Sequence, residues 1–182
     1  MKEQISSDLF MPEARKPSRY YLAYGSNLWP HRIKSRCPDA VIAGRTVFRG
    51  YRLLFKHSKS GSYATLEQDA NCCVPCGIYK ISERDESILD RYEGFPKYYY
   101  KKYFRLPLMN ADGQWSKKVV CMVYIMRENR LLGKPSKEYY SFLDDGCRFW
   151  GFDRDHLEKG LQASIGNEAA RRYLDEYEAG LW

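Results

Sequence analysis

Alternating apolar and polar residues dominate the first two thirds of the chain and predict a β-rich domain. Residues 19–24 form an apolar and aromatic run of strand length. Residues 40–58 carry apolar side chains at near-alternate positions, which indicates a long or bent strand pair. Further strands are expected at 63–66, 74–81, 99–108 and 115–125, with turns at 60–62 and 110–113.

The clearest internal helix opens at Ser82 and ends at Gly94. Serine is a favoured N-cap, and the acids that follow it lie where the helix dipole stabilises negative charge. Glycine suits the left-handed position just past a helix end. The expected buried face of this helix carries Ile88, Leu89 and Tyr92.

The other predicted helices lie nearer the two ends of the chain. One is expected over about 30–36, and the last quarter of the chain has a helical pattern, most clearly over 168–177. Residues 1–18 combine prolines, scattered charge and weak periodicity, which is typical of a loosely packed tail. Residues 19–182 are expected to form a single domain, because 182 residues are too few for two comfortable cores.

Composition favours a folded protein with an aromatic cavity or interface. The chain is 44% hydrophobic and contains 16 tyrosines, a residue that suits strands and pocket walls. No apolar run reaches the length of a membrane span, and the first residues lack the apolar core of a signal peptide. We therefore expect a cytoplasmic location and no membrane partner.

Six cysteines raise the question of a metal or disulfide site. Cys73 and Cys76 have the spacing of a ligand pair, but the chain has no second such pair and no Cys-His pair at zinc-finger spacing. The pair leads into a predicted strand, whereas redox dithiols open a helix. The sequence thus predicts reduced, mostly structural thiols, with no metal and no cofactor.

The formal net charge of +7 makes nucleic acid a partner to consider. Basic residues follow one predicted strand, and others interleave with tyrosines over 97–103, as in proteins that stack single-stranded bases. No recognised nucleic-acid motif accompanies them. Solvated strand faces are the favoured interpretation, and the same positive field would attract a small anionic substrate. The basic residues are Arg45, Arg49, Arg52, Lys56, Lys97, Lys101 and Lys102.

The most informative stretch is the predicted strand-to-helix corner over residues 21–28. Gly25 permits an unusual backbone angle, Asn27 is a favoured N-cap, and Pro30 is tolerated in a helix's first turn. Such a corner directs free N–H groups at one spot and can seat a carboxylate or phosphate. An ordinary capped turn is the alternative.

Glu93 stands apart from the other acids of the chain. It lies four residues after Leu89, on the expected buried side of its helix, and in the last turn, where the dipole disfavours negative charge. Both effects raise the pKa of a carboxylate, as a general base at neutral pH requires. The alternative is a helix-end glutamate that reaches water past Gly94.

Together these segments resemble the gamma-glutamyl cyclotransferase family, in its avirulence-induced-gene-like and butirosin-biosynthesis cyclotransferase-like branches. The resemblance rests on the sequence Tyr24-Gly25-Ser26-Asn27 after a strand, with Glu93-Gly94 about seventy residues later. The stretch 63–66, the tyrosines after Glu93 and the Pro-Ser pair before Tyr139 fit the family's order, and the likeness spans roughly residues 19–161.

This resemblance implies an α+β fold, a small mixed β-barrel with flanking α-helices. It implies that a substrate's α-amine attacks its own γ-glutamyl carbonyl, giving 5-oxoproline and a released amine or amino acid. Glu93 would be the general acid/base. The residues expected to bind the small-molecule substrate are Tyr21, Leu22, Ala23, Tyr24, Gly25, Ser26, Asn27, Tyr100 and Tyr139, although neighbouring tyrosines leave the register of the last two open.

Other functions remain in competition. A member of the same fold that binds a small ligand without converting it is the first alternative, since fold does not fix function. A serine hydrolase built on Ser26 is less attractive, because no histidine is suggestively placed and the nucleophile-elbow pattern is missing. The leaving group and the oligomeric state, monomer or homodimer, stay open.

Overall fold

A computed structural model describes residues 18–110 and 112–181, so most of the predicted tail lies outside the described residues. The elements run in the order β1 (Arg19–Ala23), the 3-10 helix η1 (Ser26–Leu28), α1 (Pro30–Arg36), β2 (Val41–His57), β3 (Ser62–Ile81), α2 (Glu83–Glu93), β4 (Tyr99–Met109), β5 (Trp115–Met126), α3 (Lys137–Trp150), α4 (Asp155–Ile165) and α5 (Asn167–Glu178).

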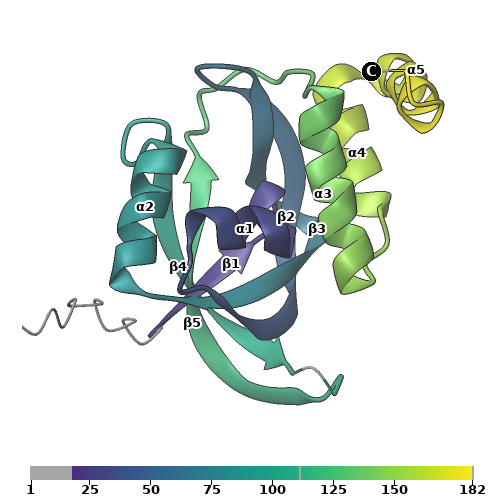
Figure 1. The fold of residues 1–182 in the computed structure, drawn as a ribbon. Coiled ribbons are helices and arrows are strands. Elements are labelled where there is room, and N and C mark those ends of the chain that lie inside the picture. The colour runs from purple at the N-terminus through teal and green to yellow at the C-terminus, as the bar shows by residue number, and fades with distance from the viewer. Residues whose placement is uncertain (1–17, 111, 182) are drawn as a thin grey trace, which may run out of the picture.

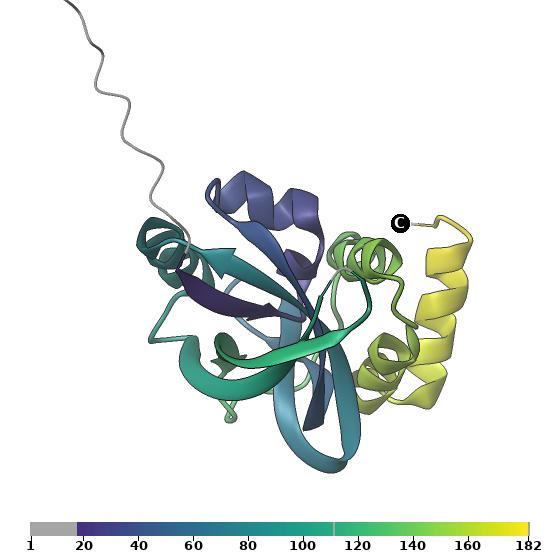
Figure 2. The ribbon, with the colours of Figure 1, turned by 90° about the horizontal axis from the view of Figure 1, so that it is seen from below.

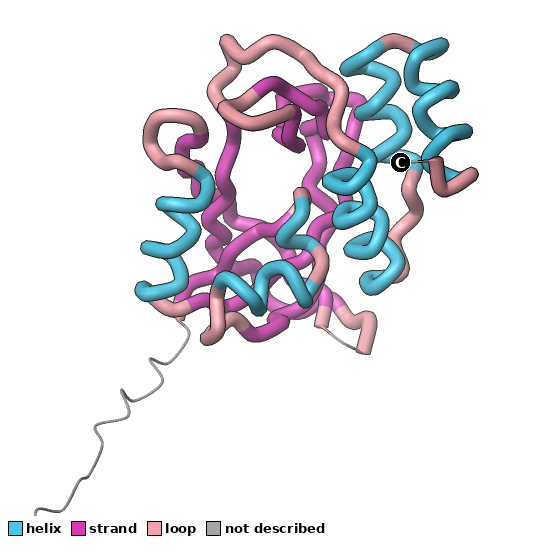
Figure 3. Tube along the Cα trace, turned by 45° about the horizontal axis from the view of Figure 1, so that its top comes forward, coloured by secondary structure: helices cyan, strands magenta, loops and turns pink. Residues whose placement is uncertain are grey.

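The five strands close into a barrel in the order β1-β3-β2-β4-β5. β1 pairs antiparallel with β3 and parallel with β5, and the other pairs are antiparallel, so the sheet is mixed. The strands curve round a common centre and helices cover the outside (Figures 2 and 3). The predicted α+β class and the small mixed barrel with flanking helices are confirmed.

β3 is one long strand, where two shorter strands were predicted, and β2 is a single strand over the region predicted as a long or bent strand pair. β3 runs unbroken through residues 67–73, but its pairing with β2 passes from Gln68, opposite Tyr51, directly to Cys73, opposite Arg49. A register shift also lies at Gly44, whose φ is +151°. A methyl group there would lie 2.2 Å from the Met109 carbonyl oxygen, so glycine lets β2 approach β4 and close the barrel.

α2 lies on one side of the barrel and α3, α4 and α5 on the other, with α1 between them (Figure 1). Among the last three helices, Gly160 of α4 packs on the backbone of β2 at Leu53. The hydroxyl of Ser164 accepts a hydrogen bond from the Phe55 N–H of β2 (2.8 Å). α2 begins at the predicted Ser82 cap and ends at Gly94 in the left-handed conformation.

The buried face of α2 differs from the prediction. Tyr92 is 49% exposed, whereas Asp85 and Glu86 are buried alongside Leu89. The burial of Glu86 is electrostatic, because Arg19 and Lys101 of the barrel pair with its carboxylate.

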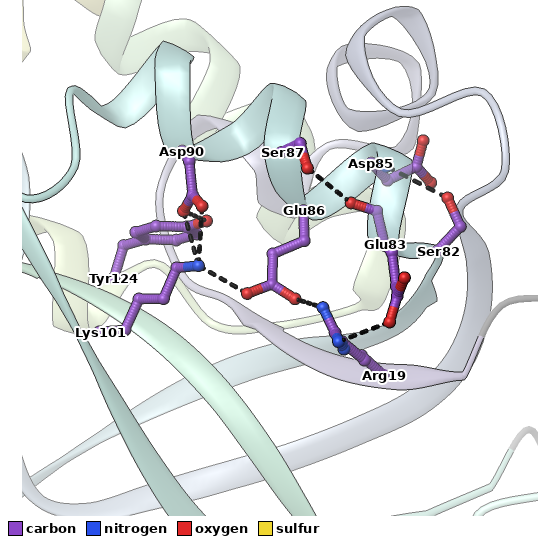
Figure 4. A network of polar contacts seen from close by, with 9 residues as sticks. All are labelled: Arg19, Ser82, Glu83, Asp85, Glu86, Ser87, Asp90, Lys101 and Tyr124. Carbon is purple, nitrogen blue, oxygen red and sulfur yellow. Dashed lines mark hydrogen bonds and ion pairs between the residues drawn. The ribbon is translucent and has the colours of Figure 1, made fainter.

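A polar network joins α2 to three strands of the barrel (Figure 4). The Lys101 ammonium of β4 lies 2.5 Å from a Glu86 oxygen and 2.7 Å from an Asp90 oxygen. Arg19 of β1 pairs with Glu86 on its other side, and the Tyr124 hydroxyl of β5 donates to Asp90 (2.7 Å). The network fixes the position of α2, and therefore of its last residue, Glu93.

Within the described residues, no helix is long and apolar enough to cross a bilayer. The six cysteines are all described, and all are free thiols. Cys73 and Cys76 lie within β3 rather than at a helix start, one exposed and one buried.

Candidate active site

A cavity of about 360 Å³ opens where the β1–η1 corner, the tip of the β2–β3 hairpin, the end of α2 and the start of α3 meet. It brings together residues up to 118 positions apart in the sequence, from Tyr21 to Tyr139. Its walls are rich in tyrosine and carry few charges. The lining residues are Tyr21, Tyr24, Gly25, Ser26, Asn27, Ser58, Lys59, Ser60, Tyr63, Ala64, Arg91, Tyr92, Glu93, Gly94, Tyr98, Tyr99, Tyr124 and Tyr139.

The corner after β1 is a single 3-10 turn that precedes α1. The Leu28 N–H donates to the Gly25 carbonyl (2.8 Å), and α1 begins with Pro30 in its first position, as expected. Two buried side chains, Tyr79 and Trp150, donate to the Leu28 carbonyl at 2.9 and 2.8 Å. The turn is therefore held to the barrel and to α3 by its own backbone.

Gly25 allows the corner to approach α3 closely. A methyl group at Gly25 would lie 3.3 Å from the Tyr139 hydroxyl oxygen, a tight contact, so a larger residue would press on that hydroxyl. The same oxygen accepts a hydrogen bond from the Ala64 N–H of β3 (3.1 Å). Corner, hairpin and α3 thus converge on one tyrosine.

The prediction that Asn27 caps a helix is wrong. No side-chain cap bond forms at η1 or α1, because both ends of the Asn27 amide are used elsewhere. Its nitrogen donates to the Tyr21 hydroxyl (3.0 Å), and its oxygen accepts from Arg36. The side chain ties the corner to β1 and α1 instead.

Glu93 ends α2 and faces the cavity. The residue is half-buried, and the surrounding protein atoms remove water from its carboxylate. Burial raises the pKa of Glu93 to about 7, with the positive charge of Arg36 opposing that rise. A carboxylate with this pKa exchanges a proton readily at neutral pH.

Five tyrosines surround this carboxylate. Burial and the negative charge of Glu93 together raise the pKa of each of them, so all five stay protonated at neutral pH. The cavity therefore offers neutral hydroxyls beside a single acid, an environment suited to a polar, zwitterionic guest. The five are Tyr21, Tyr24, Tyr99, Tyr124 and Tyr139.

Arg36 is a residue of the site that sequence reasoning missed. Its guanidinium donates to Asn27 on the corner and to the Tyr92 hydroxyl (2.5 Å), and its central carbon lies 3.6 Å from the centre of the Tyr92 ring. Tyr92 immediately precedes Glu93, so Arg36 connects the two halves of the site. Its place near the end of α1 was visible in the sequence, but its direction was not.

Three residues expected to bind substrate lie outside the cavity wall. Leu22 and Ala23 are fully buried in the barrel core. Tyr100 points away from the cavity, and its hydroxyl donates to Glu128. Side chains alternate along β4, so Tyr99 faces inward instead and donates to the Ala64 carbonyl (3.2 Å). The other predicted residues, including Glu93 and Tyr139, line the cavity.

The remaining chemistry-bearing residues do not gather at this cavity. The three histidines lie elsewhere; His57 bonds Ser62 and His156 contacts Cys147. Among the residues that the structure describes, no group of three or more His, Cys, Asp or Glu is placed to hold a metal ion.

A family model for gamma-glutamyl cyclotransferase, AIG2-like proteins matches residues 21–143, from the β1 tyrosine of the cavity into α3. The chain belongs to this family. It is 28% identical over 165 residues to the gamma-glutamylcyclotransferase of Mus musculus, a match that covers 87% of this chain and 85% of the relative. The Homo sapiens gamma-glutamylcyclotransferase is 27% identical over the same length and coverage.

Solved structures of this fold superpose over most of the chain. One gamma-glutamyl cyclotransferase gives a TM-score of 0.68 at 23% identity, covering 87% of this chain and 98% of that one. A Homo sapiens protein described as uncharacterized gives a TM-score of 0.69 at 25% identity, covering 88% and 99%. The barrel with its flanking helices is therefore the fold of the family.

Proposed function

We propose that the protein is a gamma-glutamyl cyclotransferase that converts a γ-glutamyl amide to 5-oxoproline and releases an amine or amino acid. The observation that carries this proposal is Glu93, a half-buried carboxylate with a pKa of about 7, at the wall of a tyrosine-rich cavity. Membership of the family supports the same reaction.

The reaction asks little of the protein beyond positioning and one proton shuttle, because the substrate supplies its own nucleophile. Ionised Glu93 removes a proton from the substrate's α-ammonium. The freed amine attacks the γ-carbonyl carbon, and a C–N bond forms as the carbonyl oxygen takes negative charge. Protonated Glu93 then gives its proton to the leaving nitrogen, the old amide bond breaks, and the carbonyl re-forms in the five-membered ring. The ring nitrogen still carries one proton more than an amide. Glu93, ionised again, takes this proton and passes it to the released amine, which leaves as an ammonium.

The cavity suits a folded glutamyl group. A volume of about 360 Å³ holds a small zwitterion, and the corner residues Gly25 and Ser26 bring backbone against it. Lys59 and Arg91 add positive charge to a wall whose one acid is Glu93, which favours a substrate that carries carboxylates.

The first test replaces the proposed base. Glu93→Gln keeps the size of the side chain and removes its ability to accept a proton, so 5-oxoproline release from γ-glutamyl amides should fall by about 10²- to 10⁴-fold. The product is quantified by chromatography across a panel of γ-glutamyl dipeptides and γ-glutamyl amines. Glu168→Gln, at a side chain that is 90% exposed on α5, is the matched control and should keep full activity.

The same panel separates the enzyme from a non-catalytic binder. If the wild-type protein retains a γ-glutamyl compound in calorimetry but forms no 5-oxoproline from any panel member, the proposal is wrong and the binder alternative replaces it. Full activity of a correctly folded Glu93→Gln variant would leave cyclisation standing and remove Glu93 as its base.

A further inference from the structure

A directed chain of hydrogen bonds runs from α1 to the cavity. The Arg36 guanidinium donates to the Asn27 side-chain oxygen, and the Asn27 side-chain nitrogen donates to the Tyr21 hydroxyl oxygen at 3.0 Å. Asn27 and Tyr21 are 3% and 5% exposed, so bulk water does not compete for these bonds. Tyr21 lines the cavity.

The chemistry of arginine fixes the direction of this chain. A guanidinium has only donors, so the atom of Asn27 that meets it must be the carbonyl oxygen. The NH₂ group of Asn27 must then face Tyr21 and donate to it. Because the Tyr21 oxygen accepts this bond, the Tyr21 proton remains available as a donor toward the cavity.

Of the other four tyrosines around Glu93, three donate their hydroxyl proton to the protein. The Tyr24 hydroxyl donates to the Tyr124 carbonyl (2.6 Å), and the Tyr99 hydroxyl donates to the Ala64 carbonyl. The Tyr124 hydroxyl donates to Asp90. Tyr139 resembles Tyr21, because its oxygen accepts from a backbone N–H and its proton is left over.

Tyr21 differs from Tyr139 in its link to the end of α2, because Arg36 bonds both Asn27 behind Tyr21 and Tyr92 next to Glu93. Burial, and after it the negative charge of Glu93, raises the pKa of Tyr21 well above its ordinary value. In the proposed reaction Glu93 takes a proton from the attacking nitrogen and gives one to the leaving nitrogen. Both nitrogens are bonded to the γ-carbon in the tetrahedral intermediate, so the γ-carbonyl group lies beside Glu93. A hydroxyl donor next to Glu93 is therefore placed beside the oxygen that becomes negatively charged.

We propose that Tyr21 donates a hydrogen bond to the γ-carbonyl oxygen as it becomes an oxyanion, and that Arg36 is the positioning residue that orients this donor through Asn27. The inference rests on the proposed function and adds to it the residue that stabilises the transition state.

Arg36 has a second link to the same chemistry. Through its contacts with Tyr92 it holds the last turn of α2, and its charge lies close enough to oppose the rise of the Glu93 pKa. Arg36 thus affects both the orientation of the Tyr21 hydroxyl and the pKa of Glu93. The titratable or charged groups that face Glu93 or line its cavity are Arg36 of α1, Tyr21 and Tyr24 at the corner, Lys59 and Tyr63 of the hairpin, Arg91 and Tyr92 of α2, Tyr98, Tyr99 of β4, Tyr124 of β5 and Tyr139 of α3.

The test of the donor is Tyr21→Phe, which removes only the hydroxyl. We expect kcat to fall by about 10²-fold with KM changed less than threefold, since the oxyanion exists only in the transition state. Tyr20→Phe on the outward-facing neighbour, whose ring lies beside Lys80, is the matched control and should leave both constants unchanged. A rise in KM with unchanged kcat would overturn the assignment, because it would make Tyr21 a ground-state anchor.

The direction of the chain is tested at Asn27. In Asn27→Asp the carboxylate accepts from Arg36 and from the Tyr21 hydroxyl, which turns the Tyr21 proton away from the cavity. This variant should lose about as much kcat as Tyr21→Phe, and the double variant should lose no more than either single variant. Additive losses would show that the two residues act separately and would overturn the proposal.

Two substitutions test the role of Arg36: one removes its positive charge, and the other keeps the charge but removes the planar guanidinium. Arg36→Met should lower kcat and move the acid limb of kcat/KM above pH 7, because the cation that holds down the Glu93 pKa is gone. Arg36→Lys should restore the pH profile but not kcat, since lysine lacks the planar fork that reaches Asn27 and Tyr92 together. Arg32→Met, one turn earlier on α1 over the Phe142 ring, is the control.

Failure of the inference is distinct from failure of the proposed function. No 5-oxoproline from the wild-type protein removes the reaction itself. A fully active wild type together with fully active, folded Tyr21→Phe and Arg36→Met variants removes only the oxyanion donor and its positioning residue.

Discussion

At the scale of single residues, the raised pKa that suits Glu93 to proton transfer also lowers the stability of the fold at neutral and alkaline pH. In the unfolded chain its carboxyl group has an ordinary pKa of 4.5, whereas in the fold burial raises the pKa to about 7. The folded state therefore binds a proton that the unfolded state has lost between these two values. Glu93 stabilises the fold least above pH 7, where the buried group must be charged.

The free energy of unfolding of the Glu93→Gln variant should show this loss of stability. Above pH 7 the variant should unfold with a free energy up to about 3 kcal/mol larger than the wild type, because a neutral amide replaces a buried charge. The difference should shrink as pH falls through 7 and vanish below about 4.5. Urea unfolding at pH 8, 6 and 4 measures it, and a pH-independent difference would contradict the raised pKa.

At the scale of elements, the position of α2 depends on a few charged contacts between the helix and the barrel. Lys101 and Glu86 are each 11% exposed and Asp90 is 29% exposed, so these ions are only partly solvated. Removing one partner from such a group leaves the others uncompensated, which is strongly destabilising. The network of Figure 4 is therefore the weak point of the attachment of α2.

Lys101→Met tests this attachment. It keeps the aliphatic stem, removes the cation between two carboxylates, and should lower the free energy of unfolding by about 2–4 kcal/mol. Lys102→Met, one residue along β4, where the ammonium lies 5.6 Å from the Tyr100 ring, should change it by less than about 0.5 kcal/mol. Equal effects of the two substitutions in urea titrations would contradict the importance of the network.

The elements also show what the sequence could and could not predict. The signals that begin and end a helix lie in adjacent residues of the sequence, so the N-cap Ser82 and the C-cap Gly94 of α2 were predicted correctly. The division of β3 into two strands was wrong, because the strand continues through 67–73 while its pairing with β2 jumps from Gln68 to Cys73, an irregularity that the local pattern does not reveal. The exposure of Tyr92 was missed because its ring and hydroxyl contact Arg36 of α1, a partner that the pattern of α2 does not reveal.

The candidate site divides in the same way. Glu93 and the corner residues could be found from the sequence, since a helix end and a strand-to-helix corner leave local signals. Arg36 could not, because its partners on α2 and the corner meet it only in the folded chain. The choice between Tyr99 and Tyr100 needed the register of β4, which its pairing with β5 supplies.

At the scale of the whole molecule, the net charge of +7 and the cations at the cavity wall act on the approach of substrate. A γ-glutamyl dipeptide is a net monoanion near pH 7, whereas a γ-glutamyl alkylamide is a neutral zwitterion. Only the dipeptide gains long-range attraction from the positive field. The two substrates therefore separate electrostatic capture from the chemistry of ring closure.

Ionic strength should distinguish the two substrates. Between about 0.01 and 0.15 M NaCl the Debye length falls from about 30 to about 8 Å, and kcat/KM for the dipeptide should drop about two- to fivefold. The value for the alkylamide should stay constant within error, which makes it the internal control. Equal salt dependence for both substrates would contradict a role for the positive field in substrate capture.

The β2–β3 hairpin has a consequence for how this protein can diversify. Its tip, closed by the bond from the Ser58 N–H to the Gly61 carbonyl (2.7 Å), supplies Lys59 and Ser60 to the cavity wall, while the barrel ladder begins only at Ser62. Mutation or lengthening of this turn leaves the pairing of every strand intact. Selection can therefore alter the shape and charge of this part of the cavity wall while the proposed oxyanion donor on β1 and the proposed base at the end of α2 stay in place.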